Sequence, residues 1–305
     1  MSGFVDLQVN GYGGVDFNSE SLTDEAMHRV CGRLLDDGTG RILATIITAP
    51  IDTMLRRIRN LARLIDSSTD ISSTIAGIHV EGPFLSDQNG FVGAHPPNAT
   101  MDASVDVANS LLDAGAGHVK IVTLAPERDP GGRVTCELAK QGIVVAAGHS
   151  DASVDQLDVA IDQGLSLFTH LGNACPALVP RHDNIIQRVL SRSERLMISF
   201  IADGHHVPPP ALKNYLQCVP SDNVVIVTDA ISAAGLGPGR YELSDQVVEV
   251  DEDGAAWSAC RTHFAGCAST FPQMVGVLKE RVGVSDQQID QWMRINPSRL
   301  LGISV

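Results

Sequence analysis

Residues 75–83 read Ile-Ala-Gly-Ile-His-Val-Glu-Gly-Pro, an apolar run that ends in a carboxylate and a Gly-Pro turn. A short run of this kind, rich in β-branched residues and bounded by turn residues, predicts a buried strand. In a parallel α/β barrel, side chains at the carboxyl ends of strands form the functional rim. The stretch therefore predicts both a strand and a candidate site residue, Glu81.

The same pattern recurs along the chain, because seven other short apolar runs alternate with stretches of helical period. Met27, Val30 and Leu34 mark one predicted helix, which Gly38 ends. Eight strands joined by helices predict a parallel sheet closed into an α/β barrel, the (β/α)8 or TIM barrel. The predicted strands span residues 4–9, 42–48, 75–80, 119–124, 143–147, 165–169, 196–202 and 224–228.

The domain organisation follows from the length and from a change of pattern after residue 229. We expect residues 1–305 to form a single barrel, since one barrel domain commonly holds about 250 residues. Residues 240–270 predict a β-rich insertion with a turn at 251–254, and residues 271–305 predict C-terminal helices. Residues 11–14 lack the spacing of a phosphate-binding loop, and we interpret them as a tight turn with positive φ.

The composition disfavours several functional classes. A net charge of −14 opposes nucleic acid and anionic membranes as partners, and any phosphorylated substrate needs a local cation. The chain is 44% hydrophobic, yet no apolar run approaches the roughly 20 residues that a membrane helix needs. The six cysteines form no Cys-x-x-Cys pair, which argues against a zinc ribbon or a disulfide framework. We expect a cytoplasmic location, because the first residues show no secretion signal.

Four polar residues close predicted strands: Glu81 the third, His149 the fifth, His170 the sixth and Asp229 the eighth. We expect them to converge, because the carboxyl ends of barrel strands share one rim. Any single histidine could be structural, so their joint placement is what indicates a site. One glutamate and two histidines are a known ligand set for catalytic Zn²⁺ or Fe²⁺ that leaves room for water. Asp229 would then be the proton shuttle.

The other histidines carry weaker signals. His95 lies in a long polar loop, where packing and substrate contact are both possible, and a position over the rim favours contact. His205 and His206 follow the seventh predicted strand, so we expect one of them to point inward. Four further histidines have no such context, and we interpret them as structural or surface residues: His28, His118, His182 and His263.

Further short strings run in order across nearly the whole chain. They are residues 3–11 (GFVDLQVNG), 79–85 (HVEGPFL), 124–127 (LAPE), 148–150 (GHS), 169–174 (THLGNA), 202–207 (ADGHHV), 227–230 (VTDA), 265–266 (AG) and 296–297 (NP). On these strings the chain resembles the N-acetylglucosamine-6-phosphate deacetylase family of the amidohydrolase superfamily. Gln8 and Asn10 stand where many relatives in the superfamily carry two histidine ligands. Neutral amides bind Zn²⁺ or Fe²⁺ poorly, so the resemblance is to the branch with one metal.

The resemblance implies a ligand set, a mechanism and a substrate site. One divalent metal per subunit, Zn²⁺ in first place and Fe²⁺ as the alternative, would bind Glu81, His149 and His170. Asp229 would take a proton from the attacking water and pass it to the leaving amine, while His95 would help to polarise the acetyl carbonyl. The residues that would bind the substrate are Ala94, His95, Asn173, Ala174, Arg181, His206, Phe264, Ala265 and Gly266.

The resemblance also implies a homodimer, in which Arg181 reaches the neighbouring site and supplies the cation that a phosphate needs. Some positions depart from the family pattern. Gly172 and Cys175 replace an aromatic residue and a methionine, and the usual Pro-Gly does not follow Arg181. The small β-sandwich domain of the family is largely missing, and the barrel flank that this exposes favours oligomerisation.

The activity that the resemblance implies is deacetylation of N-acetylglucosamine 6-phosphate to glucosamine 6-phosphate and acetate. One alternative is another acetylated amino-sugar phosphate, such as N-acetylgalactosamine 6-phosphate, or a different amide. A second alternative is a non-catalytic barrel kept as a binding protein. The intact residues Glu81, His149, His170 and Asp229 argue against the binding protein, whereas the missing sandwich favours it.

Overall fold

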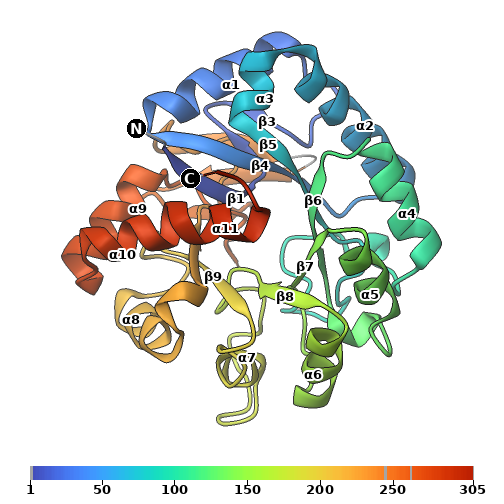
Figure 1. Cartoon of the computed structure of the whole chain (residues 1–305). Coiled ribbons are helices and arrows are strands. Elements are labelled where there is room, and N and C mark those ends of the chain that lie inside the picture. The colour runs from blue at the N-terminus through green and yellow to red at the C-terminus, as the bar shows by residue number, and fades with distance from the viewer. Residues whose placement is uncertain (1–2, 244–245, 262, 305) are drawn as a thin grey trace.

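A computed structural model describes residues 3–243, 246–261 and 263–304, and eight parallel strands form its central sheet (Figure 1). Each strand of this sheet pairs in parallel with the next one in chain order. The predicted barrel is confirmed, and the predicted runs differ from the strands only at their ends. The strands are β1 (Phe4–Val9), β4 (Thr39–Ile47), β5 (Ile75–Glu81), β6 (Val119–Leu124), β7 (Val144–Ala147), β8 (Leu165–Phe168), β9 (Met197–Ile201) and β10 (Val224–Val227).

The first and last strands of the sheet meet just beyond their hydrogen-bonded ladders. Val9 forms a parallel bridge with Ala230, and the Asn10 backbone N–H donates to the Ala230 carbonyl at 2.7 Å. The buried Asp6 carboxylate accepts from the Thr228 backbone N–H at 3.2 Å and from its hydroxyl at 2.6 Å. The Asp6 side chain thus helps to close the barrel at this seam.

Helices surround the strands on the outside of the barrel (Figure 1). In the first of them, Thr23 accepts from the Ala26 backbone N–H at 3.2 Å as the N-cap, and Met27, Val30 and Leu34 face the core. Within the described ranges, no helix has the length and apolar composition to cross a bilayer. The helices are α1 (Asp24–Asp36), α2 (Ile51–Ser67), α3 (Thr69–Thr74), α4 (Val105–Ala114), α5 (Arg133–Lys140), α6 (Val154–Asp162), α7 (Ile185–Leu190) and α8 (Pro209–Cys218).

A small antiparallel sheet follows the barrel strands. Its first two strands form a hairpin within the segment where a β-rich insertion is predicted, and residues 244–245 between them lie outside the described residues. The sheet consists of β11 (Gly239–Leu243), β12 (Gln246–Val250) and β13 (Ala256–Ser258). It has its own apolar cluster, in which Val248 and Val250 pack with Ile231 and Ala265. This cluster attaches the sheet to the segment after β10.

Residues 271–282 form an α-helix continued by a π-helix, and further helical elements follow them. Phe271 lies edge-on to Phe4 with ring centroids 5.7 Å apart, so these helices pack against the start of β1. The C-terminal elements are α9 (Phe271–Val277), η4 (Leu278–Val282), α10 (Asp286–Asp290), η5 (Gln291–Ile295) and α11 (Asn296–Leu301).

The segment predicted as a tight turn is a hairpin, β2 (Gly11–Tyr12) and β3 (Val15–Asp16). Gly13 and Gly14 have φ of 56° and 87°, as expected for glycines in such a turn. The Gly14 backbone N–H donates to the Ser232 carbonyl at 2.7 Å, so the hairpin supports the loop after β10. Other loops contain the short 3₁₀ helices η1 (Pro97–Ala99), η2 (Pro126–Arg128) and η3 (Ser221–Asn223).

Candidate active site

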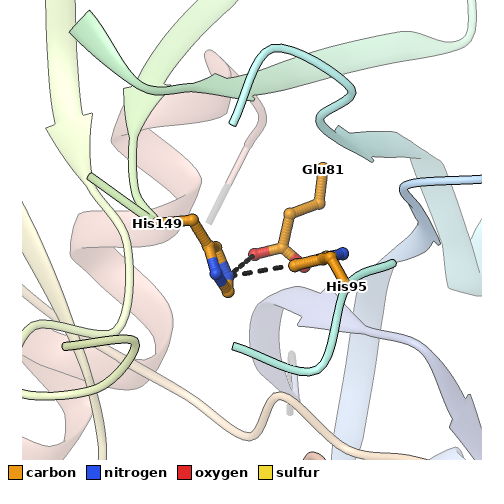
Figure 2. A group of neighbouring side chains, drawn as sticks. All are labelled: Glu81, His95 and His149. Carbon is orange, nitrogen blue, oxygen red and sulfur yellow. Dashed lines mark hydrogen bonds and ion pairs between the residues drawn. The ribbon is translucent and has the colours of Figure 1, made fainter. Parts of the chain in front are cut away.

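The three predicted metal ligands come together at the carboxyl-end rim of the barrel. Glu81 ends β5, His149 follows β7 and His170 follows β8. The Glu81 Oε1 atom lies 3.1 Å from His170 Nε2 and 3.3 Å from His149 Nε2, and all three side chains are buried. Figure 2 shows the His149 ring directed at the Glu81 carboxylate. The barrel thus joins side chains that are far apart in the sequence.

A shared backbone conformation presents several of these side chains. His149, His170 and Asp229 have φ of 52°, 35° and 51°, in the left-handed region that non-glycine residues rarely adopt. Such a conformation costs of order 1 to 3 kcal/mol and persists where the surroundings impose it, often at functional sites. Ala174, in the loop after β8, also has a positive φ of 50°. The sequence carries no sign of this shared strain.

His95 joins the cluster from the long loop after β5. Its Nε2 atom lies 3.2 Å from His149 Nε2 and 3.7 Å from Glu81 Oε2 (Figure 2). The His149 Nδ1 atom lies 3.1 Å from the Phe91 carbonyl, which can only accept, so Nδ1 carries the proton. Nε2 is then the His149 atom that faces Glu81, where it can bind a metal in the neutral ring or donate to the carboxylate in the charged ring.

The charges of this cluster depend on burial and on mutual contacts. Burial opposes ionisation of Glu81, but hydrogen bonds from His149 and His170 outweigh it and hold its pKa well below the usual range. Burial also opposes the charged form of His170, yet its hydrogen bond to Glu81 raises its pKa. Burial and the neighbouring His149 lower the pKa of His95 to about 3, so that ring is neutral at pH 7.

These residues fit a divalent metal ion. Ligand atoms of Glu81, His95 and His149 lie within 4.8 Å of one another, and His170 Nε2 contacts the same carboxylate. Imidazole and carboxylate donors suit Zn²⁺ and Fe²⁺. Two buried polar atoms near the cluster, His95 Nδ1 and Asn10 Oδ1, have no hydrogen-bond partner among the described residues. The geometry therefore offers four donor side chains, one more than the sequence predicts.

Asp229 lies at the same rim, after β10. The Asn10 side-chain amide donates to its Oδ1 atom at 2.7 Å. Burial and the charge of Glu81 raise the pKa of Asp229, which suits a group that accepts and returns a proton.

The sequence indicates Gln8 and Asn10 only as the absence of two metal ligands, and the structure shows what these two side chains contact. Gln8 Nε2 donates to Glu81 Oε1 at 2.9 Å, and the Thr169 hydroxyl donates to Gln8 Oε1 at 2.6 Å. Residues two apart on a strand point to the same face, so both amides reach the interior. Each amide thus holds one site carboxylate, Glu81 or Asp229, and their spacing at the end of the first strand is the signal that could have revealed this.

A cavity of about 820 Å³ opens beside the cluster. Its size is within the usual range for small-molecule sites. The Asn173 side chain, which lines it, donates to the His170 carbonyl at 3.0 Å. Of the residues implied to bind the substrate, those that line the cavity are Ala94, His95, Asn173, Ala174, His206, Phe264 and Gly266.

The positions of Arg181, Ala265 and His263 also bear on the sequence expectations. Arg181 is exposed in the loop after β8 and is not among the residues that line the cavity. Ala265 is buried in the apolar cluster of the small sheet and does not line the cavity. His263 does line it, as does Trp257 of β13, so the interpretation of His263 as a residue without site context is wrong. The position of the small sheet decides where Ala265, Trp257 and His263 lie.

Comparison with known proteins places this site in a family. No family model matches the chain. N-acetylglucosamine-6-phosphate deacetylase of Danio rerio is 32% identical over 309 residues, which cover 99% of this chain and 75% of that protein. The chain belongs to the N-acetylglucosamine-6-phosphate deacetylase family. The resemblance stated from the sequence strings is confirmed.

Other members of this deacetylase family extend the match. The N-acetyl-D-glucosamine-6-phosphate deacetylase of Mycobacterium smegmatis, solved as a mutant with N-acetyl-D-glucosamine-6-phosphate, has a TM-score of 0.89 and 32% identity. The match covers 99% of this chain and 77% of that one. N-acetylgalactosamine-6-phosphate deacetylase of Escherichia coli O157:H7 is 29% identical and is covered to 77%. Relatives at this distance thus include names for both sugar epimers.

Proposed function

We propose that the protein hydrolyses the N-acetyl group of N-acetylglucosamine 6-phosphate, releasing acetate and glucosamine 6-phosphate. The observation that carries the proposal is the placement of Asp229 beside the cluster of Glu81, His149, His170 and His95 in one cavity. A proton-transfer group next to a candidate metal centre is the arrangement that metal-assisted amide hydrolysis uses. The names of the relatives support the same reaction.

The proposed cofactor is one divalent metal per subunit, Zn²⁺ in first place and Fe²⁺ as the alternative. Glu81, His149 and His170 would bind this metal, and His95 is the nearest further side chain with a ligand atom. The metal would lower the pKa of water and polarise the acetyl carbonyl. Gln8 and Asn10 donate to the site carboxylates, which supports a single metal rather than two.

The proton path needs only the chain's own residues. Asp229 accepts a proton from the attacking water as the water oxygen bonds to the acetyl carbon. It then gives this proton to the amide nitrogen as the C–N bond breaks. Asn10 holds Asp229 Oδ1, which leaves Oδ2 for the proton. His95 is neutral and can donate an N–H to the acetyl carbonyl oxygen.

Recognition of the sugar phosphate is assigned to the lining of the cavity. Asn173, Ala174, His206, Phe264 and Gly266 would surround the sugar and its phosphate. Ala94 would contact the substrate beside His95, and Ala265 would act only through its position between Phe264 and Gly266.

We assign the cation for the phosphate to Arg181 of a second subunit in a homodimer. Arg181 is exposed, and Leu178 in the same loop has 93% of its surface exposed. A dimer contact over this loop would cover that leucine. Arg181→Ala should raise KM for the phosphorylated sugar far more than for N-acetylglucosamine, and light scattering should give the mass of a dimer. Equal effects on both sugars would contradict this role.

N-acetylgalactosamine 6-phosphate is the second candidate substrate, favoured by the relative from Escherichia coli O157:H7. The two sugars are epimers, so they test the fit of the cavity without changing the reaction. The comparisons give no support to a non-catalytic barrel, since the relatives are named as deacetylases.

The test is acetate release from both sugar phosphates by metal-loaded wild type and by Asp229→Asn. We expect Asp229→Asn to lower kcat by roughly 10² to 10⁴ while the bound metal is retained, because it removes the proton acceptor. Asp129→Asn is the matched control, since Asp129 is a buried carboxylate that accepts from the backbone of α5. An unchanged rate in Asp229→Asn would contradict the mechanism, and no acetate from either sugar would contradict the function.

A further inference from the structure

A further buried carboxylate lies beside the cavity, outside the candidate metal cluster. Asp203 follows β9, and its Oδ1 atom accepts from the backbone N–H groups of His205 and His206, both at 2.9 Å. Its Oδ2 atom lies 2.7 Å from His206 Nδ1 and accepts from the Cys267 thiol at 3.4 Å. Every group around this carboxylate therefore has a proton to donate.

Asp203 is ionised in this arrangement. Burial opposes its ionisation, but the neighbouring His206 ring and the backbone N–H groups of His205 and His206 hold its pKa far below the usual range. Burial and the charge of Asp203 raise the pKa of Cys267 well above its ordinary value, so the thiol remains a donor.

An ionised Asp203 determines the protonation of the His206 ring. A carboxylate only accepts, so His206 Nδ1 carries a proton. The Nε2 atom, on the other side of the ring, is then left to contact a ligand in the cavity that His206 lines. Phe264 lies against the ring with centroids 4.8 Å apart, and Trp257 lies 4.4 Å from Phe264. The Asp203 carboxylate and the Phe264 ring thus hold the His206 ring from two sides.

We propose that Asp203 is a positioning residue that fixes the tautomer and orientation of His206 for contact with the phosphorylated sugar. The proposal rests on the proposed function for the identity of the ligand. It assigns Asp203 no contact with the substrate, since Asp203 acts through His206. A side chain that orients an imidazole by hydrogen bonding to its far nitrogen is a general device of binding sites.

Asp203→Asn tests this idea with little change in shape. The amide has one accepting oxygen and one donating nitrogen, whereas all partners of Asp203 are donors. If the amide oxygen keeps the two backbone N–H groups, the amide nitrogen faces His206 Nδ1. His206 Nδ1 must then accept from the amide instead of donating. The His206 ring therefore carries its proton on Nε2.

The first experiment reads the tautomer directly and needs no substrate. Ring-nitrogen NMR of histidine-labelled protein would be compared for wild type and Asp203→Asn, with the His206 signals identified by their loss in His206→Gln. We expect the Nδ1–H form in wild type and the Nε2–H form in the variant. The same tautomer in both proteins would overturn the proposal. If the variant does not fold, the wild-type spectrum still decides, because an Nε2–H ring there contradicts the proposal.

The second experiment is a double-mutant cycle on acetate release. We expect Asp203→Asn to lower kcat/KM roughly tenfold to a hundredfold, the loss of a charge-assisted hydrogen bond. In a His206→Gln background the same change should add less than about twofold, because its route of action is gone. Multiplied losses in the double variant would show a merely structural role and overturn the proposal.

Asp129→Asn is the matched control for both experiments. The Asp129 carboxylate is buried and accepts from the Val134 and Thr135 backbone N–H groups at 3.0 and 2.8 Å. It should leave the His206 tautomer and kcat/KM unchanged. If wild type releases no acetate, the proposed function fails, while the NMR experiment still tests the role of Asp203.

Discussion

Two clusters among the described residues combine a buried carboxylate with histidine, and they differ in how their polar atoms are satisfied. In the rim cluster, Glu81 faces three imidazole rings, and His95 Nδ1 has no partner among the described residues. In the cluster after β9, Asp203 accepts four hydrogen bonds, two of them from backbone N–H groups. Both clusters place three potential ligand atoms within 4.8 Å. Proximity alone therefore does not separate them.

The physical difference lies in the availability of lone pairs. A metal needs donor atoms whose lone pairs are free, and imidazole nitrogens can supply them by carrying their proton on the other ring atom. The carboxylate of Asp203 is engaged by donors, and the backbone N–H groups among them cannot give up their protons. Glu81 therefore belongs to a candidate metal centre, and Asp203 belongs to a hydrogen-bonded cluster that supports His206.

Metal content gives the largest expected contrast between the two clusters. Glu81→Gln should lose the bound metal and lower kcat/KM about a thousandfold or more, because a charged ligand becomes a neutral amide. Asp203→Asn should retain the metal. Elemental analysis of dialysed protein, beside acetate release, measures both. Retained metal in Glu81→Gln would contradict the assignment of Glu81 as a metal ligand. Two equivalents of metal in wild type would contradict the assignment of a single metal.

Asn10→Ala tests whether Asn10 orients the proposed proton shuttle, Asp229. It removes the 2.7 Å hydrogen bond to Asp229 without touching a proposed ligand. We expect kcat to fall roughly tenfold to a hundredfold with the metal retained, because the carboxylate loses its orientation. Steady-state kinetics with metal analysis measures this, and Asn60→Ala, at a half-buried asparagine on α2, is the control. An unchanged kcat would mean that Asp229 is held without Asn10.

A third buried carboxylate, Asp6 at the barrel seam, extends the comparison to stability. Burial raises the pKa of Asp6 to about 7, whereas an unfolded aspartate titrates near 4. Between these values the folded state holds a proton that the unfolded state lacks. The free energy of unfolding should therefore fall as pH rises through this window, by roughly 1.4 kcal/mol per pH unit from this group.

Asp6→Asn should remove this contribution, because the amide does not titrate. Urea unfolding of both proteins at about pH 5 and about pH 7 measures the difference in slope. Parallel pH profiles would show that the hydrogen bonds from Thr228 keep Asp6 charged in the folded state. Acetate release by the folded variant should change little, since Asp6 does not line the cavity.

Cys267→Ser is expected to have the smallest effect. The serine hydroxyl can donate the same hydrogen bond to Asp203, so kcat/KM should change less than about threefold. In native wild type, Cys267 should resist alkylation, because it is buried and burial raises its pKa, while the exposed Cys218 and Cys260 react. Mass spectrometry of the labelled peptides checks this. Alkylation of Cys267 in the folded protein would show that the cluster of hydrogen bonds around Asp203 opens.

Much of this architecture could be predicted from local pattern. The apolar runs that predict eight strands coincide with the strands, because burial on both faces of a parallel sheet leaves a continuous apolar signal. The convergence of Glu81, His149 and His170 followed from their position at strand ends. The entry of His95 into the cluster did not, because it depends on the path of a long loop. The contributions of Trp257 and His263 depend likewise on where the small sheet lies.

Local sequence pattern is enough to predict the barrel and the residues at its rim, because strand periodicity and strand ends are properties of neighbouring residues. Which buried carboxylate accepts from backbone N–H groups and a thiol, and which faces three imidazole rings, depends on how the chain packs. The reason is that the partners come from distant segments: Cys267 reaches Asp203 across 64 positions, and His170 reaches Glu81 across 89. Hydrogen-bond saturation, which separates a support from a candidate metal centre, exists only once those segments have packed together.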